Sequence, residues 1–182
     1  MRITGGTAKG QQLKIPKNLL IRPTTDRVRE AIFSILTSLT SHWSRGLDLY
    51  AGSGALGIEA LSRDMEWVDF VDQEPRCCAI IKGNLEKVGF SQKSHVYCYG
   101  AAKALTFLSD TYDIVFMDPP YSDPAINNLI TQLAKSKLTG NKSFIVVSHA
   151  SRLPLSPDYN GLYLAKERRY GDTCISIYQK EA

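Results

Sequence analysis

An acid, two prolines and an aromatic residue, Asp118, Pro119, Pro120 and Tyr121, directly follow the apolar run of residues 114–117. The run is typical of a buried strand, so the motif is expected at the strand's carboxyl end, where open α/β sheets bind ligands. The carboxylate of Asp118 and the carbonyl of Pro119 can each accept a hydrogen bond from one NH2 group, and the Tyr121 ring can lie against a flat base. These residues predict a site that methylates a planar amine. The competing explanation is a rigid strand-to-helix turn that Asp118 caps.

A glycine-rich segment follows the first expected strand and opens a helix, and Gly52, Gly54 and Gly57 match the pattern G-x-G-x-x-G. Glycine lets the backbone approach a ligand and lets the helix pack closely on the strand. Asp72 ends the next strand, where an acid can bind a ribose. The pattern alone also fits a nicotinamide dinucleotide. Taken singly, Asp48 also fits a strand-end acid held by backbone amides, and Asp72 also fits a helix cap.

Taken together, these residues favour S-adenosylmethionine as the cofactor. Asp48 precedes the loop, where an acid can serve the cationic methionine end, and the motif at Asp118 supplies an acceptor for the methyl group. A nicotinamide enzyme would also need a substrate region that 182 residues barely provide. The residues expected to bind the cofactor here are Asp48, Tyr50, Ala51, Gly52, Ser53, Gly54, Gly57, Asp72 and Gln73.

Length and composition limit the class of protein. A chain of 182 residues can form one well-buried core, and its 43% hydrophobic and 22% charged residues are typical of a globular protein in water. No apolar run approaches the roughly 20 residues that cross a bilayer, and the first residues do not look like a signal peptide, so we expect a cytoplasmic protein. The four cysteines have neither metal-ligand nor disulfide spacing, so we expect reduced thiols and no metal.

Positive charge is concentrated at the amino end. Through residue 29 the chain has seven basic residues and one acidic residue, whereas the remainder has 15 basic and 17 acidic residues. A basic segment on a near-neutral body is typical of binding to a phosphate backbone, and a solvated tail is the alternative. The residues expected to contact nucleic acid are Arg2, Lys9, Lys14, Arg22, Arg27 and Arg29.

The spacing of apolar residues predicts a three-layer α/β sandwich. Residues 1–24 alternate short apolar stretches with turn formers and are expected to form a hairpin-like extension, and residues 25–182 the main part of what is effectively a single domain. Thr25 is the expected N-cap of a first helix. Strands are then predicted at 47–51, 67–71, 95–98, 114–117, 144–147, 162–164 and 175–178, and helices at 55–63, 75–88, 102–108 and 124–135. The result is a mostly parallel seven-stranded sheet that ends in an antiparallel hairpin.

Nearly the whole chain resembles the bacterial small-subunit ribosomal RNA guanine-N2 methyltransferases of the RsmD type. The matching segments are residues 2–6 with 9–10, 22–24 with 26–31, the glycine loop extended through 57–63, 118–121 and 170–173. The resemblance implies a class I, Rossmann-like methyltransferase fold and S-adenosylmethionine as the donor. It also implies that the acceptor is the N2 amine of one guanine in 16S ribosomal RNA, presented in an assembling or assembled subunit. We expect a monomer.

The chain departs from the family in two places. Ala101 and Ala102 follow the third strand where many relatives place a polar residue to hold adenine, so we expect backbone amides at these two positions to make that contact. Ser148 and His149 stand where relatives often have Glu-His, and the residues assign neither of them a role. Amino-methyltransferases of DNA adenine or cytosine, or of protein glutamine, hold an NH2 group in the same way and remain alternatives, as does a nucleic-acid-binding module without catalysis.

Overall fold

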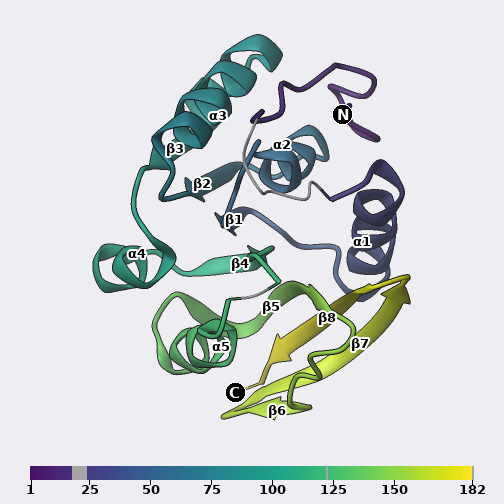
Figure 1. The fold of residues 1–182 in the computed structure, drawn as a ribbon, viewed down its shortest axis with the longest axis vertical. Coiled ribbons are helices and arrows are strands. Elements are labelled where there is room, and N and C mark those ends of the chain that lie inside the picture. Colours follow the sequence, from purple (N-terminus) through teal and green to yellow (C-terminus); the bar gives the residue numbers. More distant parts are fainter. Residues whose placement is uncertain (18–23, 122, 182) are drawn as a thin grey trace.

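The structure, a computed structural model, describes residues 1–17, 24–121 and 123–181. An eight-stranded sheet forms its centre, with the strand order β3-β2-β1-β4-β5-β8-β7-β6. The first five strands in this order are parallel, and β8, β7 and β6 continue the sheet in antiparallel pairs (Figure 1). The strands are β1 (Arg45–Leu49), β2 (Trp67–Val71), β3 (Ser94–Tyr97), β4 (Tyr112–Met117), β5 (Thr139–Ala150), β6 (Asp158–Tyr159), β7 (Leu162–Tyr170) and β8 (Thr173–Lys180).

Helices cover both faces of the sheet, which confirms the predicted three-layer α/β sandwich. The helices are α1 (Asp26–Leu39), α2 (Ala55–Ser62), α3 (Pro75–Val88), α4 (Ala101–Phe107) and α5 (Ile126–Lys135), with a short 3-10 turn, η1 (Ser91–Lys93). The first three helices pack on one face and the last two on the other (Figure 1). None of the helices in the described ranges is long and apolar enough to span a membrane.

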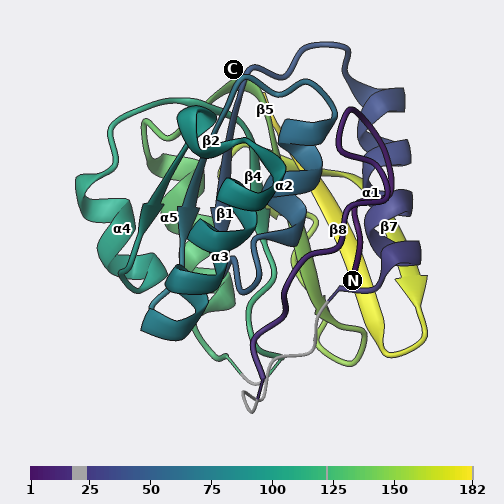
Figure 2. The same cartoon turned by 90° about the horizontal axis from the view of Figure 1, so that it is seen from above.

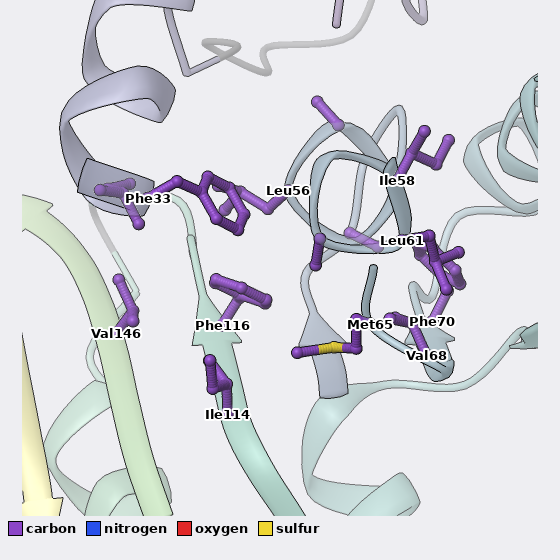
Figure 3. Close-up of a cluster of buried hydrophobic side chains, with 14 of the residues drawn as sticks. Phe33, Leu56, Ile58, Leu61, Met65, Val68, Phe70, Ile114, Phe116 and Val146 are labelled. Atoms are coloured by element: carbon purple, nitrogen blue, oxygen red, sulfur yellow. The ribbon is translucent and has the colours of Figure 1, made fainter. Parts of the chain in front are cut away.

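The core consists of two apolar layers, one on each side of the sheet. Figure 3 shows the layer under α1 and α2, where Phe33 of α1 meets Phe116 of β4 with ring centroids 5.7 Å apart. Phe70 of β2 packs beneath α2 in the same layer. Parallel strands buried on both faces need apolar residues in succession, and this requirement explains the continuous apolar runs in the sequence.

Local signals place the elements that hold the site. The hydroxyl of Thr25 accepts from the amide of Val28 at 3.2 Å and caps α1, as predicted. The bounds predicted for β2 and α3 are confirmed. The first strand was expected to reach Ala51 but ends at Leu49, because Tyr50 has φ +57° and leaves the extended conformation.

The seven-stranded prediction is wrong by one strand. The extra strand, β6, has two residues and pairs with β7 inside a segment rich in turn formers. Two residues are too few to produce a readable alternation of apolar and polar positions. The predicted terminal hairpin is confirmed as β7 and β8, joined at Gly171.

The amino-terminal segment forms a small hairpin that is packed on the domain. Arg2 and Gln12 form an antiparallel bridge, and Ile3, Ala8 and Leu13 are buried in the same core layer as α2. The segment lies beside α2 in two perpendicular views (Figure 1 and Figure 2). Residues 1–17 of the predicted extension are therefore anchored to the main core by these three side chains, while most of their other side chains stay on the surface.

Candidate active site

A cavity of about 530 Å³ opens at the carboxyl ends of β1, β2 and β4. Its volume lies within the range of small-molecule sites, and its position is the edge where open α/β sheets bind ligands. The predicted residues that line it are Asp48, Tyr50, Ala51, Gly52, Ser53, Asp72, Gln73, Ala101, Asp118, Pro119, Pro120 and Tyr121. One cavity thus brings together the glycine loop and the Asp-Pro-Pro-Tyr motif, which are more than 60 residues apart in sequence.

Three residues predicted to bind the cofactor lie outside the cavity lining. Gly54 caps α2 with φ +82°, a conformation that favours glycine. Gly57 lets α2 approach the sheet, because a Cβ there would lie 2.3 Å from the Phe70 ring. Ala102 is exposed on α4, whereas Ala101 is buried, because consecutive residues of a helix point in different directions. The two glycines shape the loop, and the backbone contact predicted at Ala102 stays a prediction.

Asp72 organises the loop between β1 and α2. Its Oδ2 accepts from the amide of Gly52 at 2.8 Å, and its Oδ1 accepts from the amide of Glu74 at 2.9 Å. Burial raises the pKa of Asp72, and the two amides oppose that shift. The carboxylate therefore fixes the glycine loop while it also faces the cavity.

Asp48 brings a second acid to the cavity from the end of β1. It is 1% exposed, and its Oδ2 accepts from the amide of Gly57 at 2.9 Å. Burial raises the pKa of Asp48 well above its ordinary value, and the charges of Asp118 and Asp72 add to the shift. Three acids around one partly apolar cavity favour a ligand that carries positive charge.

Asp118 directly follows β4, and its carboxylate lies near two hydroxyl groups. Thr24 donates to its Oδ2 at 2.5 Å, and the hydroxyl of Ser148 in β5 is near enough to affect its pKa. Burial raises the pKa of Asp118, and the two hydroxyls oppose the shift. The contact with Asp118 gives Ser148 a role that sequence alone did not assign.

The rest of the motif forms a closed turn beside this acid. The amide of Asp123 donates to the carbonyl of Pro120 at 3.0 Å. The hydroxyl of Tyr121 is hydrogen-bonded to Thr173, the first residue of β8. The Tyr121 ring is thereby held at the cavity wall, and the resembling segment at 170–173 is explained as its support.

The basic residues at the amino end divide into two groups. Arg2, Lys9, Lys14 and Arg27 are exposed, as a surface for nucleic acid requires, and Arg22 lies outside the described residues. The prediction that Arg29 contacts nucleic acid is wrong, because Arg29 is 0% exposed. Its guanidinium donates to the Thr24 carbonyl at 2.9 Å and to Asp26 at 2.8 Å, and it also donates to the carbonyl of Arg2. Helical periodicity turns Arg29 inward, so it ties the amino-terminal segment to α1.

His149 belongs to a buried polar network on the antiparallel side of the sheet. Its Nε2 lies 2.8 Å from the hydroxyl of Ser176, and Ser176 donates to Glu167 at 2.9 Å. His149, Glu167 and Cys174 have ligand-type atoms within 4.8 Å of one another. The Ser176 hydroxyl partners both His149 and Glu167 and so links two members of this cluster.

Several residues that line the cavity were not predicted from sequence. They are Met1, Ile15, Pro16, Thr24, Ala55, Leu56, Val71, Glu74, Gly100 and Arg152. Met1, Ile15 and Pro16 reach the cavity only because the amino-terminal hairpin folds over it, and no motif marks such positions. Thr24 belongs to segment 22–24, which was matched by resemblance, and this was the one available signal.

Comparisons with known proteins agree with this geometry. The family model described as conserved hypothetical protein 95 matches residues 1–179. A candidate rRNA methyltransferase of Bacillus subtilis, YlbH, is 35% identical, with 99% of each chain covered. Ribosomal RNA small subunit methyltransferase D of Escherichia coli is 31% identical over 100% of this chain and 91% of its own.

A solved structure of a candidate methyltransferase from Escherichia coli, yhhF, superposes with a TM-score of 0.87 at 29% identity. It covers 100% of this chain and 98% of its own. The fold, the family model and the full-length relatives therefore agree. The chain belongs to the family described as conserved hypothetical protein 95, together with the small-subunit ribosomal RNA methyltransferases of the RsmD type.

Proposed function

We propose that this protein transfers the methyl group of S-adenosylmethionine to the exocyclic N2 amine of a guanine in small-subunit ribosomal RNA. The observation that carries the proposal is the Asp118 carboxylate, which directly follows β4 and shares one cavity with the glycine loop. The names of the full-length relatives support an RNA acceptor. The resemblance described above supports guanine N2 as the methylated atom.

The cavity residues fit this cofactor. When bound, it supplies an electrophilic methyl group on a positively charged sulfur. Asp72 would bind its ribose hydroxyls, and Asp48 would favour its cationic methionine end. Gly100 and Ala101 line the cavity without a polar side chain, so they would contact the adenine through their backbone.

Asp118 and Pro119 would orient the acceptor. A guanine amine is a poor nucleophile, because its lone pair is delocalised into the ring. Acceptance of one N–H by the Asp118 carboxylate and of the other by the Pro119 carbonyl directs the lone pair toward the methyl group. The N–C bond forms as the S–C bond breaks, and the amine then loses a proton to Asp118 or to water.

Tyr121 would stack on the guanine. A base inside a helix cannot reach a half-buried carboxylate in the cavity, so the nucleotide must turn out of its stack. Because the Tyr121 hydroxyl is held by Thr173, the ring is fixed before the base arrives. Such a fixed surface lowers the entropy cost of holding the base.

The direct test is methyl transfer followed by identification of the product. Labelled S-adenosylmethionine is supplied with small ribosomal subunits, protein-free ribosomal RNA and DNA, and the nucleosides are analysed by mass spectrometry. We expect N2-methylguanosine from subunits or RNA. Label in DNA bases, or none in nucleic acid but some in protein, would reject the proposal and favour another amino-methyltransferase.

Removal of the Asp48 charge is expected to stabilise the ligand-free protein and to weaken cofactor binding. The folded state holds the proton of the Asp48 carboxyl more tightly than the unfolded chain does. Ionisation of Asp48 therefore lowers the free energy of unfolding as pH rises above 3.8, the ordinary pKa of this carboxyl. Asp48→Asn should raise the free energy of unfolding at pH 7 by about 1 kcal/mol, or about 2–4 °C in Tm. Melting curves with and without S-adenosylmethionine measure both effects, and a lower Tm without ligand would contradict the argument.

Neutralising the exposed amino-terminal charges is expected to weaken RNA binding. We expect the triple change Arg2→Gln, Lys9→Gln and Lys14→Gln to flatten the plot of log K against log salt by up to about 0.9 per lost phosphate contact. The control variant loses the same charge through replacement of the exposed Lys103, Lys135 and Lys137 by glutamine. Lys103 lies in α4, Lys135 ends α5 and Lys137 follows it, and both helices cover the face of the sheet opposite the hairpin. Equal slopes for the two triple variants would assign the hairpin a purely structural role.

A further inference from the structure

The charge of the cavity is almost uniformly negative. Its ionisable carboxyl groups are Asp48, Asp72, Glu74 and Asp118, and Arg152 is the one basic side chain among the described residues that line it. This composition suits a cationic cofactor. It opposes an RNA nucleotide, because each nucleotide brings a phosphate with a negative charge. Entry of the acceptor therefore requires a positive group near the cavity mouth.

Arg152 has the position and the freedom for this task. It is exposed and lines the same cavity as Thr24, Pro120 and Tyr121, the part of the wall that holds the acceptor motif. Among the described residues it makes no hydrogen bond and no ion pair. All five N–H donors of its guanidinium are thus available to a ligand.

The backbone around Arg152 is fixed at several points. The amide of Leu153 donates to the Ala150 carbonyl at 3.0 Å, and the amide of Ser151 donates to Asp172 at 2.8 Å. Nδ1 of His149 lies 3.1 Å from the Ala150 carbonyl and 3.0 Å from the Leu153 carbonyl. Because a carbonyl only accepts, Nδ1 must donate to this turn, while Nε2 faces Ser176.

The same strand connects this turn to the reacting group. Ser148 of β5 interacts with Asp118, and Arg152 follows only four residues later. A nucleotide with its amine at half-buried Asp118 has its base inside the cavity, and its sugar and phosphate must remain toward the exposed rim. Arg152 lies at that rim on a turn that His149 holds in place.

We infer that Arg152 binds the backbone phosphate of the nucleotide whose base enters the cavity, and that His149 is the positioning residue for its turn. This inference rests on the proposed function. Arginine pairs with phosphate through two parallel N–H···O bonds and cannot lose its charge near neutral pH. The pair offsets the repulsion between the acidic cavity and the RNA.

The test compares Arg152→Gln with Arg152→Lys and with the control Lys137→Gln. Lys137 is exposed and precedes β5, whereas Arg152 follows β5, so the two residues lie at opposite ends of this strand. The substrate is the subunit or RNA that the wild-type protein methylates. Arg152→Gln should lower kcat/KM about 10–100-fold, mainly through KM, and should reduce the salt slope of kcat/KM by about one. Arg152→Lys should retain an activity between those of wild type and Arg152→Gln, because it keeps the charge but loses the two parallel N–H···O bonds. Affinity for S-adenosylmethionine should not change.

His149→Gln tests the positioning role. It should raise KM for RNA less than Arg152→Gln does, and the double variant should resemble Arg152→Gln alone, since both changes affect one contact. If wild type methylates RNA and Arg152→Gln behaves like Lys137→Gln, the inference is wrong while the function stands. Equal loss in Arg152→Lys and Arg152→Gln with an unchanged salt slope would also reject the phosphate contact. No methylation of RNA by the wild-type protein would instead reject the proposed function.

Discussion

Replacement of Asp118 by alanine is expected to lower the rate of methyl transfer on the order of 100–1,000-fold or more and to leave affinity for S-adenosylmethionine nearly unchanged. The carboxylate accepts an N–H of the acceptor amine and stabilises the positive charge that develops on nitrogen. The cofactor side of the cavity is built by Asp48, Asp72 and the glycine loop, so its contacts survive the change. Single-turnover methylation and calorimetric titration of the cofactor measure the two effects separately.

Asp118→Asn is the matched variant, because it keeps the shape and one acceptor oxygen but removes the charge. It should retain more activity than the alanine variant and far less than wild type. Near-normal turnover in a folded Asp118→Ala protein would overturn the assignment. Loss of cofactor binding together with activity would show that the change disrupts the whole cavity.

The pH dependence of the reaction provides an independent check on this group. Burial raises the pKa of Asp118, so the ionised acceptor forms only at a higher pH than for an ordinary aspartate. The rate should therefore rise with pH through that raised pKa. Thr24→Val removes a donor that favours the charged form and should move the acidic limb to still higher pH. If Thr24→Val leaves the acidic limb of the pH–rate profile where it is, that limb belongs to a group other than Asp118.

The largest expected effect on stability comes from Glu59 of α2, which is 0% exposed. Its two oxygens accept from the amides of Thr4 and Gly5, each at 2.9 Å, and from Nε of Arg63 at 3.0 Å. Nε of Arg29, also buried, lies 3.7 Å away. Glu59→Ala would leave these donors without their acceptor and would remove one of the two acids beside the buried Arg29 guanidinium, the other being Asp26. It should lower the free energy of unfolding by about 3–5 kcal/mol.

Chemical denaturation measures this loss, and limited proteolysis should show earlier cleavage within the amino-terminal hairpin. Glu59→Gln keeps an acceptor and should fall between alanine and wild type. Exposed Glu86 on α3 is the control, because its replacement by alanine should change stability by about 0.5 kcal/mol or less. A Glu59→Ala protein as stable as the control would mean that Arg29 and the hairpin find other partners.

Much of the fold could be predicted from sequence, because its causes are local. Buried parallel strands require continuous apolar runs, and Thr25 caps α1 by contacting an amide three residues away. The glycine loop could be placed for the same reason, since strand, loop and helix are consecutive. β6 was missed because its two residues pair only with β7, so the cause of its structure lies outside its own sequence.

The residue types at the ends of β1, β2 and β4 determined by themselves that acids, glycines and an aromatic would meet at one edge of the sheet. Only the tertiary structure decided the partners of those groups. It placed Thr24 and Ser148 on Asp118, buried Arg29 against Glu59 and brought Arg152 to the cavity. A periodic pattern indicates which face of an element is buried, whereas hydrogen bonds and charges depend on distances between segments far apart in the chain, and packing sets those distances.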